Sequence, residues 1–184
     1  MKQIGLTLVV VTVIALVLGV STPGVLAATE CNGVFTGQTF IGGLDVGPLD
    51  TCILNDSVVA GGIHMTGGTL EVCGSMVAGG VHVTGGASVT LGAGLDDGLT
   101  CAGNAISGGV KISGVLLFGP GVASVELEGN SINGAVSLDN NNVVEVESNI
   151  INGSLECSGN LVPVSNNGFP NTVTGKESGQ CAGL

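Results

Sequence analysis

Apolar and small residues recur in a short phrase that the chain repeats six times. Each copy reads apolar, any residue, two small residues centred on glycine, apolar, any residue, apolar, and its first glycine is Gly42, Gly61, Gly79, Gly108, Gly134 or Gly153. Successive copies are therefore 19, 18, 29, 26 and 19 residues apart. Helix-pair repeats have periods of about 33 to 47 residues, so these shorter spacings predict one β-solenoid turn per copy, with insertions in the longer turns.

A second apolar alternation lies between the phrases, for example Val89-Thr90-Leu91 and Val125-Glu126-Leu127. Its period of two is typical of strands that bury alternate residues. A small or polar pair such as Gly129-Asn130 precedes most copies, and such residues tolerate the left-handed backbone of tight corners. We therefore predict an all-β, single-stranded parallel β-helix of about six coils, about 29 Å long at 4.8 Å per coil. It is predicted to be right-handed, because left-handed coils use a stricter hexapeptide period.

Two columns of aliphatic residues are expected to fill the interior. They are Phe40, Val59, Val77, Ile106, Ile132 and Ile151, and Leu44, Ile63, Val81, Val110, Val136 and Leu155. The composition of 34 Gly, 44% hydrophobic and 9% charged residues, with β-branched residues regularly placed, excludes a disordered chain. We expect one domain over 28–184, with an N-terminal cap and first coil at 28–56, repeat coils at 57–157 and a C-terminal cap at 158–184.

Residues 1–27 have the features of a signal peptide. Lys2 precedes an apolar run at 6–20, and Val25-Leu26-Ala27 offers the small residues that a signal peptidase requires. Cleavage is expected after Ala27 or Ala28, which makes the protein secreted or exposed at the cell surface. The alternative is an uncleaved membrane anchor, although the apolar run is shorter than a bilayer span.

All six cysteines lie beyond the leader. An even number in an exported chain points to disulfides, and six cysteines permit 15 connectivities. Proximity along the solenoid favours Cys31 with Cys52, Cys73 with Cys101, and Cys157 with Cys181. The outer two would then staple the terminal coils, whose edges otherwise lack partners.

These features resemble those of small secreted right-handed parallel β-helix proteins, an uncharacterised exported bacterial family. The resemblance rests on Cys31-Asn32-Gly33 with Cys52, on the repeated phrase, and on the tail Cys157-Ser158-Gly159-Asn160 with Gly179-Gln180-Cys181. It implies the fold and no particular activity. The chain is more loosely similar to the bactofilins, whose glycine-rich β-helices polymerise end to end, which would imply a self-assembling filament protein.

Composition argues against an enzyme and against several partners. Polysaccharide-degrading β-helix enzymes need clusters of Asp, Lys or Arg and usually aromatic platforms, whereas the chain beyond the leader has no Arg, Trp or Tyr and only Lys111 and Lys176. Loss of Lys2 with the leader changes the formal charge from −11 to −12. Nucleic acid and anionic membrane surfaces are therefore excluded as expected partners. We expect no catalytic residues and no cofactor.

One outward column carries the main candidate chemistry, and its members are Asp45, His64, His82, Lys111, Ser137 and Glu156. His64 and His82 would lie about 4.8 Å apart on adjacent coils and could share a metal ion, although no third ligand stands in register. Asp96 and Asp97, in the insertion at 92–99, form a second weak candidate for a cation. The alternative for each is a solvated pair without a ligand.

A further column at the next corner consists of Thr66, Thr84, Ser113, Asp139 and Ser158. These side chains are expected to cap the corner rather than to bind ice, because only two threonines align.

The sequence thus predicts a non-catalytic extracellular structural or adhesive module. The alternatives are a carbohydrate-binding or polysaccharide-active β-helix, with an extracellular glycan as partner, and a self-associating filament protein.

Overall fold

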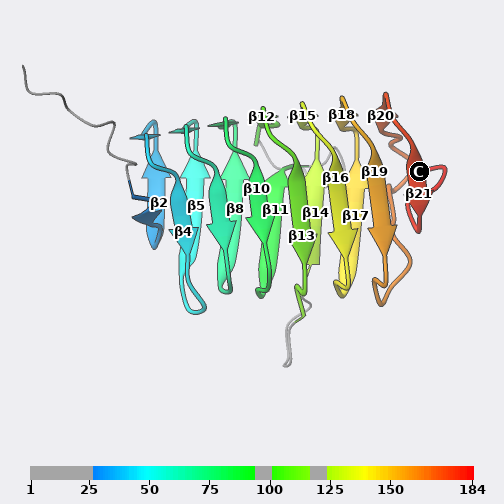
Figure 1. The fold of residues 1–184 in the computed structure, drawn as a ribbon, viewed down its shortest axis with the longest axis horizontal. Helices are drawn as coiled ribbons and strands as arrows, with labels where there is room; N and C mark the ends of the chain where they lie inside the picture. Colours follow the sequence, from blue (N-terminus) through cyan, green and yellow to red (C-terminus); the bar gives the residue numbers. More distant parts are fainter. Residues whose placement is uncertain (1–26, 94–100, 117–123) are drawn as a thin grey trace, which may run out of the picture.

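The computed structural model describes residues 27–93, 101–116 and 124–184, and every element in them is a β-strand. The proposed leader, up to residue 26, and Asp96 and Asp97 lie outside the described residues. Figure 1 shows the strands stacked turn upon turn along the long axis of the molecule. The parallel β-solenoid predicted from the repeat is therefore confirmed.

Three parallel sheets form the walls of the solenoid. The eight-stranded sheet contains β1 (Thr29–Glu30), β4 (Leu44–Val46), β7 (Ile63–Met65), β10 (Val81–Val83), β13 (Val110–Ser113), β16 (Val136–Asp139), β19 (Leu155–Ser158) and β21 (Glu177–Gly179). The six-stranded sheet contains β2 (Gly33–Thr36), β5 (Thr51–Asn55), β8 (Thr69–Cys73), β11 (Ser88–Gly92), β14 (Ser124–Glu128) and β17 (Val143–Glu147). The seven-stranded sheet contains β3 (Thr39–Phe40), β6 (Val58–Val59), β9 (Met76–Val77), β12 (Ala105–Ile106), β15 (Ser131–Ile132), β18 (Ile150–Ile151) and β20 (Thr172–Val173).

Each turn passes through the six-, seven- and eight-stranded sheets in that order. The described residues form seven turns, one more than the six copies of the repeated phrase. The seventh is made by β20, which pairs with β18, and β21, which pairs with β19. An isolated parallel bridge between Glu145 and Ser165 takes the place of its first strand. The segment 158–184, expected to be a cap, is thus largely a further turn.

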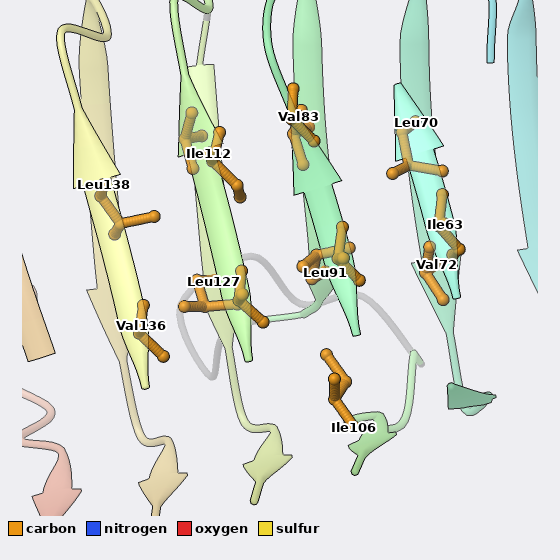
Figure 2. Close-up of a cluster of buried hydrophobic side chains, with 14 of the residues drawn as sticks. Ile63, Leu70, Val72, Val83, Leu91, Ile106, Ile112, Leu127, Val136 and Leu138 are labelled. Carbon is orange, nitrogen blue, oxygen red and sulfur yellow. The ribbon is translucent and has the colours of Figure 1, made fainter. Parts of the chain in front are cut away.

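The interior is an aliphatic column, as the alternation predicts. Strands such as β7 and β10 bury their first and third residues and expose the second. Both predicted inward columns are buried except Phe40, which is partly buried and packs edge-to-face on Phe35 with ring centres 5.5 Å apart. Figure 2 shows Ile112, Leu127 and Leu138 among the side chains that stack between the walls. Full burial of each such side chain contributes about 1.5–3 kcal/mol.

Two polar ladders run inside the corners and link consecutive turns. The first consists of Ser57, Ser75, Asn104, Asn130, Asn149 and Asn171, in which each side-chain oxygen accepts the backbone N–H of the preceding member at 2.9–3.1 Å. The second consists of Asn141, Asn160 and Gln180, with 2.9 Å bonds at both steps. The asparagine amides also donate to strand carbonyls, so these buried polar groups are satisfied within the fold.

The corner before the first ladder has the predicted left-handed backbone. The residues that precede the first two serines, Asp56 and Gly74, have φ values of 49° and 58°, and Gly129 and Ser148 have 65° and 54°. Asp56 and Ser148 show that short polar side chains accept a conformation usually left to glycine. The left-handed corner therefore recurs before Ser57, Ser75, Asn130 and Asn149 although its sequence varies, whereas Gly103 before Asn104 lacks a positive φ.

Three disulfides form with the expected connectivity: Cys31–Cys52, Cys73–Cys101 and Cys157–Cys181. The first joins the opening turn to the next, and the third joins β19 to the end of the seventh turn. The four cysteines of these two bonds have no exposed surface, whereas Cys73 and Cys101 are partly exposed. Both ends of the solenoid are therefore covalently held from within the core.

Candidate functional site

The outward residues of the eight-stranded sheet form one continuous row, which we call the outer ladder. The parallel register places in it Glu30, Asp45, His64, His82, Lys111, Ser137, Glu156 and Ser178. The six members that the sequence predicts are confirmed, and β1 and β21 add one residue at each end. At the N-terminal end of the outer ladder two carboxylates precede two imidazoles.

A shallow groove of about 240 Å³ runs beside this end of the outer ladder. Its floor consists of three stacked glycine pairs, which begin at Gly42, Gly61 and Gly79, and one wall contains Asp45, His64 and His82. A Cβ on Gly61 would lie 2.6 Å from the backbone carbon of Gly42, and one on Gly79 would lie 2.6 Å from that of Gly61. Glycine is thus required for these turns to stack.

The two imidazoles lie next to each other on this wall. His64 in β7 and His82 in β10 are register partners, and their ring centres are 5.7 Å apart with the rings tilted by 56°. His64 Nδ1 is 3.6 Å from Asp45 Oδ1, and the two side chains are 53% and 57% exposed. This separation is slightly longer than a hydrogen bond.

Asp45 is two turns away from His82, which keeps it from sharing one ion with both histidines. In the described part of the chain no group of three or more His, Cys, Asp or Glu side chains is arranged to hold a metal ion. The proximity predicted for His64 and His82 is confirmed, and metal binding by them stays a prediction. The candidates Asp96 and Asp97 fall in the segment that the structure does not describe.

The predicted corner column caps the backbone. The Thr66, Thr84 and Ser113 hydroxyls donate to carbonyl oxygens of the preceding turn, those of Val46, Met65 and Val83, at 3.2–3.5 Å. Further along, the Ser158 hydroxyl donates to Asp139 Oδ1 at 2.6 Å. These side chains serve the corner locally, as expected for hydroxyl and carboxyl groups at turns.

Sequence reasoning missed an uncharged face. The outward column of the seven-stranded sheet reads Thr39, Val58, Met76, Ala105, Ser131, Ile150 and Thr172. Met76 and Ile150 are 52% and 59% exposed. The signal was present in the sequence, because these residues stand at the repeat period immediately before the first apolar residue of each copy.

A second omission is a pair of buried carboxyl groups. Glu128 and Glu147, at the ends of β14 and β17, are register partners and are only 1% and 0% exposed. They stand two residues before Asn130 and Asn149 of the first ladder. The alternation predicts outward Glu126 and Glu145 correctly, but it gives no sign that the next glutamate turns inward at the corner.

No protein-family model, curated protein or solved structure matches this chain. Among the described residues there is no helix long and apolar enough to cross a membrane.

Proposed function

We propose that the protein is a non-catalytic extracellular module with a structural or adhesive role, a rigid rod of the cell surface or secretome. The leader at 1–27 would direct export and be cleaved after Ala27 or Ala28. Three disulfides in a small protein support this location, because such bonds persist in oxidising compartments.

The observation that carries the proposal is the continuity of the internal ladders. Hydrogen bonds through side chains link Ser57 to Asn171 across consecutive turns, and the buried disulfides hold both terminal regions. The buried amides are hydrogen-bonded as long as the turns stay stacked. Separating two turns breaks these bonds and leaves buried polar groups without partners, which costs free energy. This design favours a rod that keeps its shape over one that opens and closes.

The uncharged face supports an adhesive role for that rod. The mature chain has a formal charge of −12, so on most of its surface a partner can approach only if solvated carboxylates lose water, which costs free energy. The column that contains Val58, Met76 and Ile150 has no ionisable member and exposes apolar side chains. It is therefore the wall on which contact costs least.

Carbohydrate binding is a second candidate, favoured by the groove beside His64 and His82. Its glycine floor leaves space against a wall of one carboxylate and two imidazoles, groups that exchange hydrogen bonds with sugar hydroxyls. Self-assembly is a third candidate, because β2 is an edge strand and its Val34 is 66% exposed.

Three measurements on the mature protein distinguish these roles. For the structural or adhesive role we expect no filaments by electron microscopy, and no sugar release from pectin, alginate or chitin. Clear turnover of any of these polysaccharides would overthrow the proposal in favour of an enzyme. Selective retention on a glycan array would favour carbohydrate binding, and end-to-end filaments would favour self-assembly.

The adhesive face has its own test with matched charge changes. Beads coated with the protein should adhere to cell-envelope fragments, and Met76→Lys or Ile150→Lys should weaken this adhesion. Ser137→Lys adds the same charge to the eight-stranded sheet and should leave it unchanged. Equal effects of all three substitutions would show that net charge rather than this face governs adhesion.

A further inference from the structure

We propose that His64 and His82 form a surface site for one divalent transition-metal ion, of the class that prefers imidazole ligands. Both side chains project from the same face of adjacent parallel strands, at positions paired in register. They are the only two histidines of the chain, and the fold places them side by side. This inference does not depend on the proposed function.

The separation of the rings suits a shared ion. Metal–nitrogen bonds of about 2.0–2.1 Å at a tetrahedral angle put two imidazole centres about 5.2 Å apart. The observed distance is 5.7 Å, so a small side-chain rotation closes the remaining gap. His64 is about half exposed and free to make that adjustment.

Asp45 is placed to orient the first of the two ligands. Its Oδ1 lies 3.6 Å from Nδ1 of His64, slightly longer than a hydrogen bond, and both side chains are exposed, so a small rotation of either one forms the bond. Histidines that bind metals commonly donate their second ring N–H to a carboxylate, which fixes the tautomer and makes the other nitrogen a better ligand. This arrangement leaves Nε2 of His64 for the metal, with Asp45 outside the coordination sphere.

Neighbouring charges set the position of the ion along the outer ladder. Glu30 and Asp45 precede His64 and attract a cation, whereas Lys111 follows His82 and repels one. The ion is therefore drawn toward the N-terminal side of the imidazole pair. Coulomb interactions at this exposed surface are weakened by water and salt, so the imidazoles supply most of the affinity.

The groove explains how two protein ligands suffice. The glycine pairs that start at Gly61 and Gly79 line this groove together with the two histidines, and the groove is open to solvent. Water or a small external ligand can fill the remaining coordination positions from this side. Imidazole ligands suit copper, nickel and zinc, and Cu²⁺ is expected to bind more tightly than Zn²⁺.

Calorimetric titration of the untagged mature protein with CuCl₂ and ZnCl₂ tests the site. We expect one equivalent of Cu²⁺, electron paramagnetic resonance that shows two imidazole nitrogens, and at least tenfold weaker binding after either His64→Ala or His82→Ala. Asp45→Asn should weaken binding about tenfold, the usual size of an outer-sphere effect. Glu156→Gln removes the same charge three turns away from His82 and should change the affinity less than twofold.

Several results would overturn the proposal. They are no binding by the wild-type protein, binding that survives the double histidine variant, and a loss that follows only one of the two histidines. If Asp45→Asn and Glu156→Gln weaken binding equally, Asp45 acts only through its negative charge, and its orienting role is refuted. Circular dichroism of each variant confirms that the exposed substitutions leave the fold intact.

Discussion

Removal of the Asn130 side chain should break the first ladder at its centre. Asn130 is 1% exposed, and its Nδ2 donates to the Leu91 carbonyl at 2.7 Å and to Asn149 Oδ1 at 3.0 Å. Its Oδ1 accepts the backbone N–H and Nδ2 of Asn104, both at 2.9 Å. Four hydrogen bonds are therefore lost in Asn130→Ala.

The cost follows from what those partners can still do. Asn104 Nδ2 also donates to the Val72 carbonyl, and Asn149 Oδ1 also accepts the Asn130 backbone N–H, so two of the four partners keep a bond. The Asn104 N–H and the Leu91 carbonyl each lose their bond to Asn130. Leaving a buried donor or acceptor without this bond destabilises the fold by about 1–3 kcal/mol for each group. We expect a loss of about 4 kcal/mol in the free energy of unfolding, which lowers Tm by about 8–16 °C in a domain of this size.

Thermal and guanidinium unfolding followed by circular dichroism measures the change, since the chain has no Trp or Tyr for fluorescence. The matched control is Asn133→Ala, three residues away, whose exposed side chain accepts a single bond from Asn152 at 2.9 Å. The control should lose less than about 0.5 kcal/mol. If the two substitutions lower Tm equally, the ladder does not stabilise the fold as argued here.

Three further perturbations probe the floor, an end and the core. Gly79→Ala places a Cβ 2.6 Å from the Gly61 backbone, so the Tm of this variant should fall well below that of the exposed control Ala78→Ser. Equal Tm values would contradict the conclusion that the stacked turns require glycine here. Loss of the Cys157–Cys181 bond, which spans 24 residues, should cost about 3–4 kcal/mol in guanidinium unfolding and expose the seventh turn first in hydrogen exchange. Leu127→Ala, fully buried, should cost about 2–5 kcal/mol in the same unfolding assay, and a loss below 1 kcal/mol would argue against a close-packed core.

The sequence predicted the wall and core because both follow a single period. Once the phrase fixes the turn, residues such as His64 and His82 must fall in register, and their proximity needs no knowledge of side-chain packing. The disulfide pairing followed for the same reason, since each bond joins neighbouring turns. The hand of the coil stays a prediction.

The seventh turn was missed because it breaks the apolar pattern. After Val173 and Gly175 the chain places Glu177 and Gly179 in the register of buried Leu155 and Cys157. A terminal turn has only one neighbour to pack against, so its inward positions need not be apolar. The spacing of 22 residues between Gly153 and Gly175 was the remaining signal.

Asn141 illustrates a second limit of the pattern. The run Asn140-Asn141-Asn142 is typical of an exposed turn, yet Asn141 is fully buried and begins the second ladder. Its partner Asn160 follows 19 residues later, which is one turn of the repeat. The groove could not be predicted in this way, because its lining residues come from three turns and meet only when those turns are stacked.

Non-reducing peptide mapping of the protein recovered from outside an exporting bacterial cell tests the central claim most directly. An extracellular, disulfide-held solenoid predicts a chain that begins at Ala28 or Thr29 and contains only the bonds Cys31–Cys52, Cys73–Cys101 and Cys157–Cys181. Each bond reports the register of adjacent turns as well as the oxidation state. A chain retained in the cytoplasm with free thiols, or a bond between other cysteines, would contradict the account.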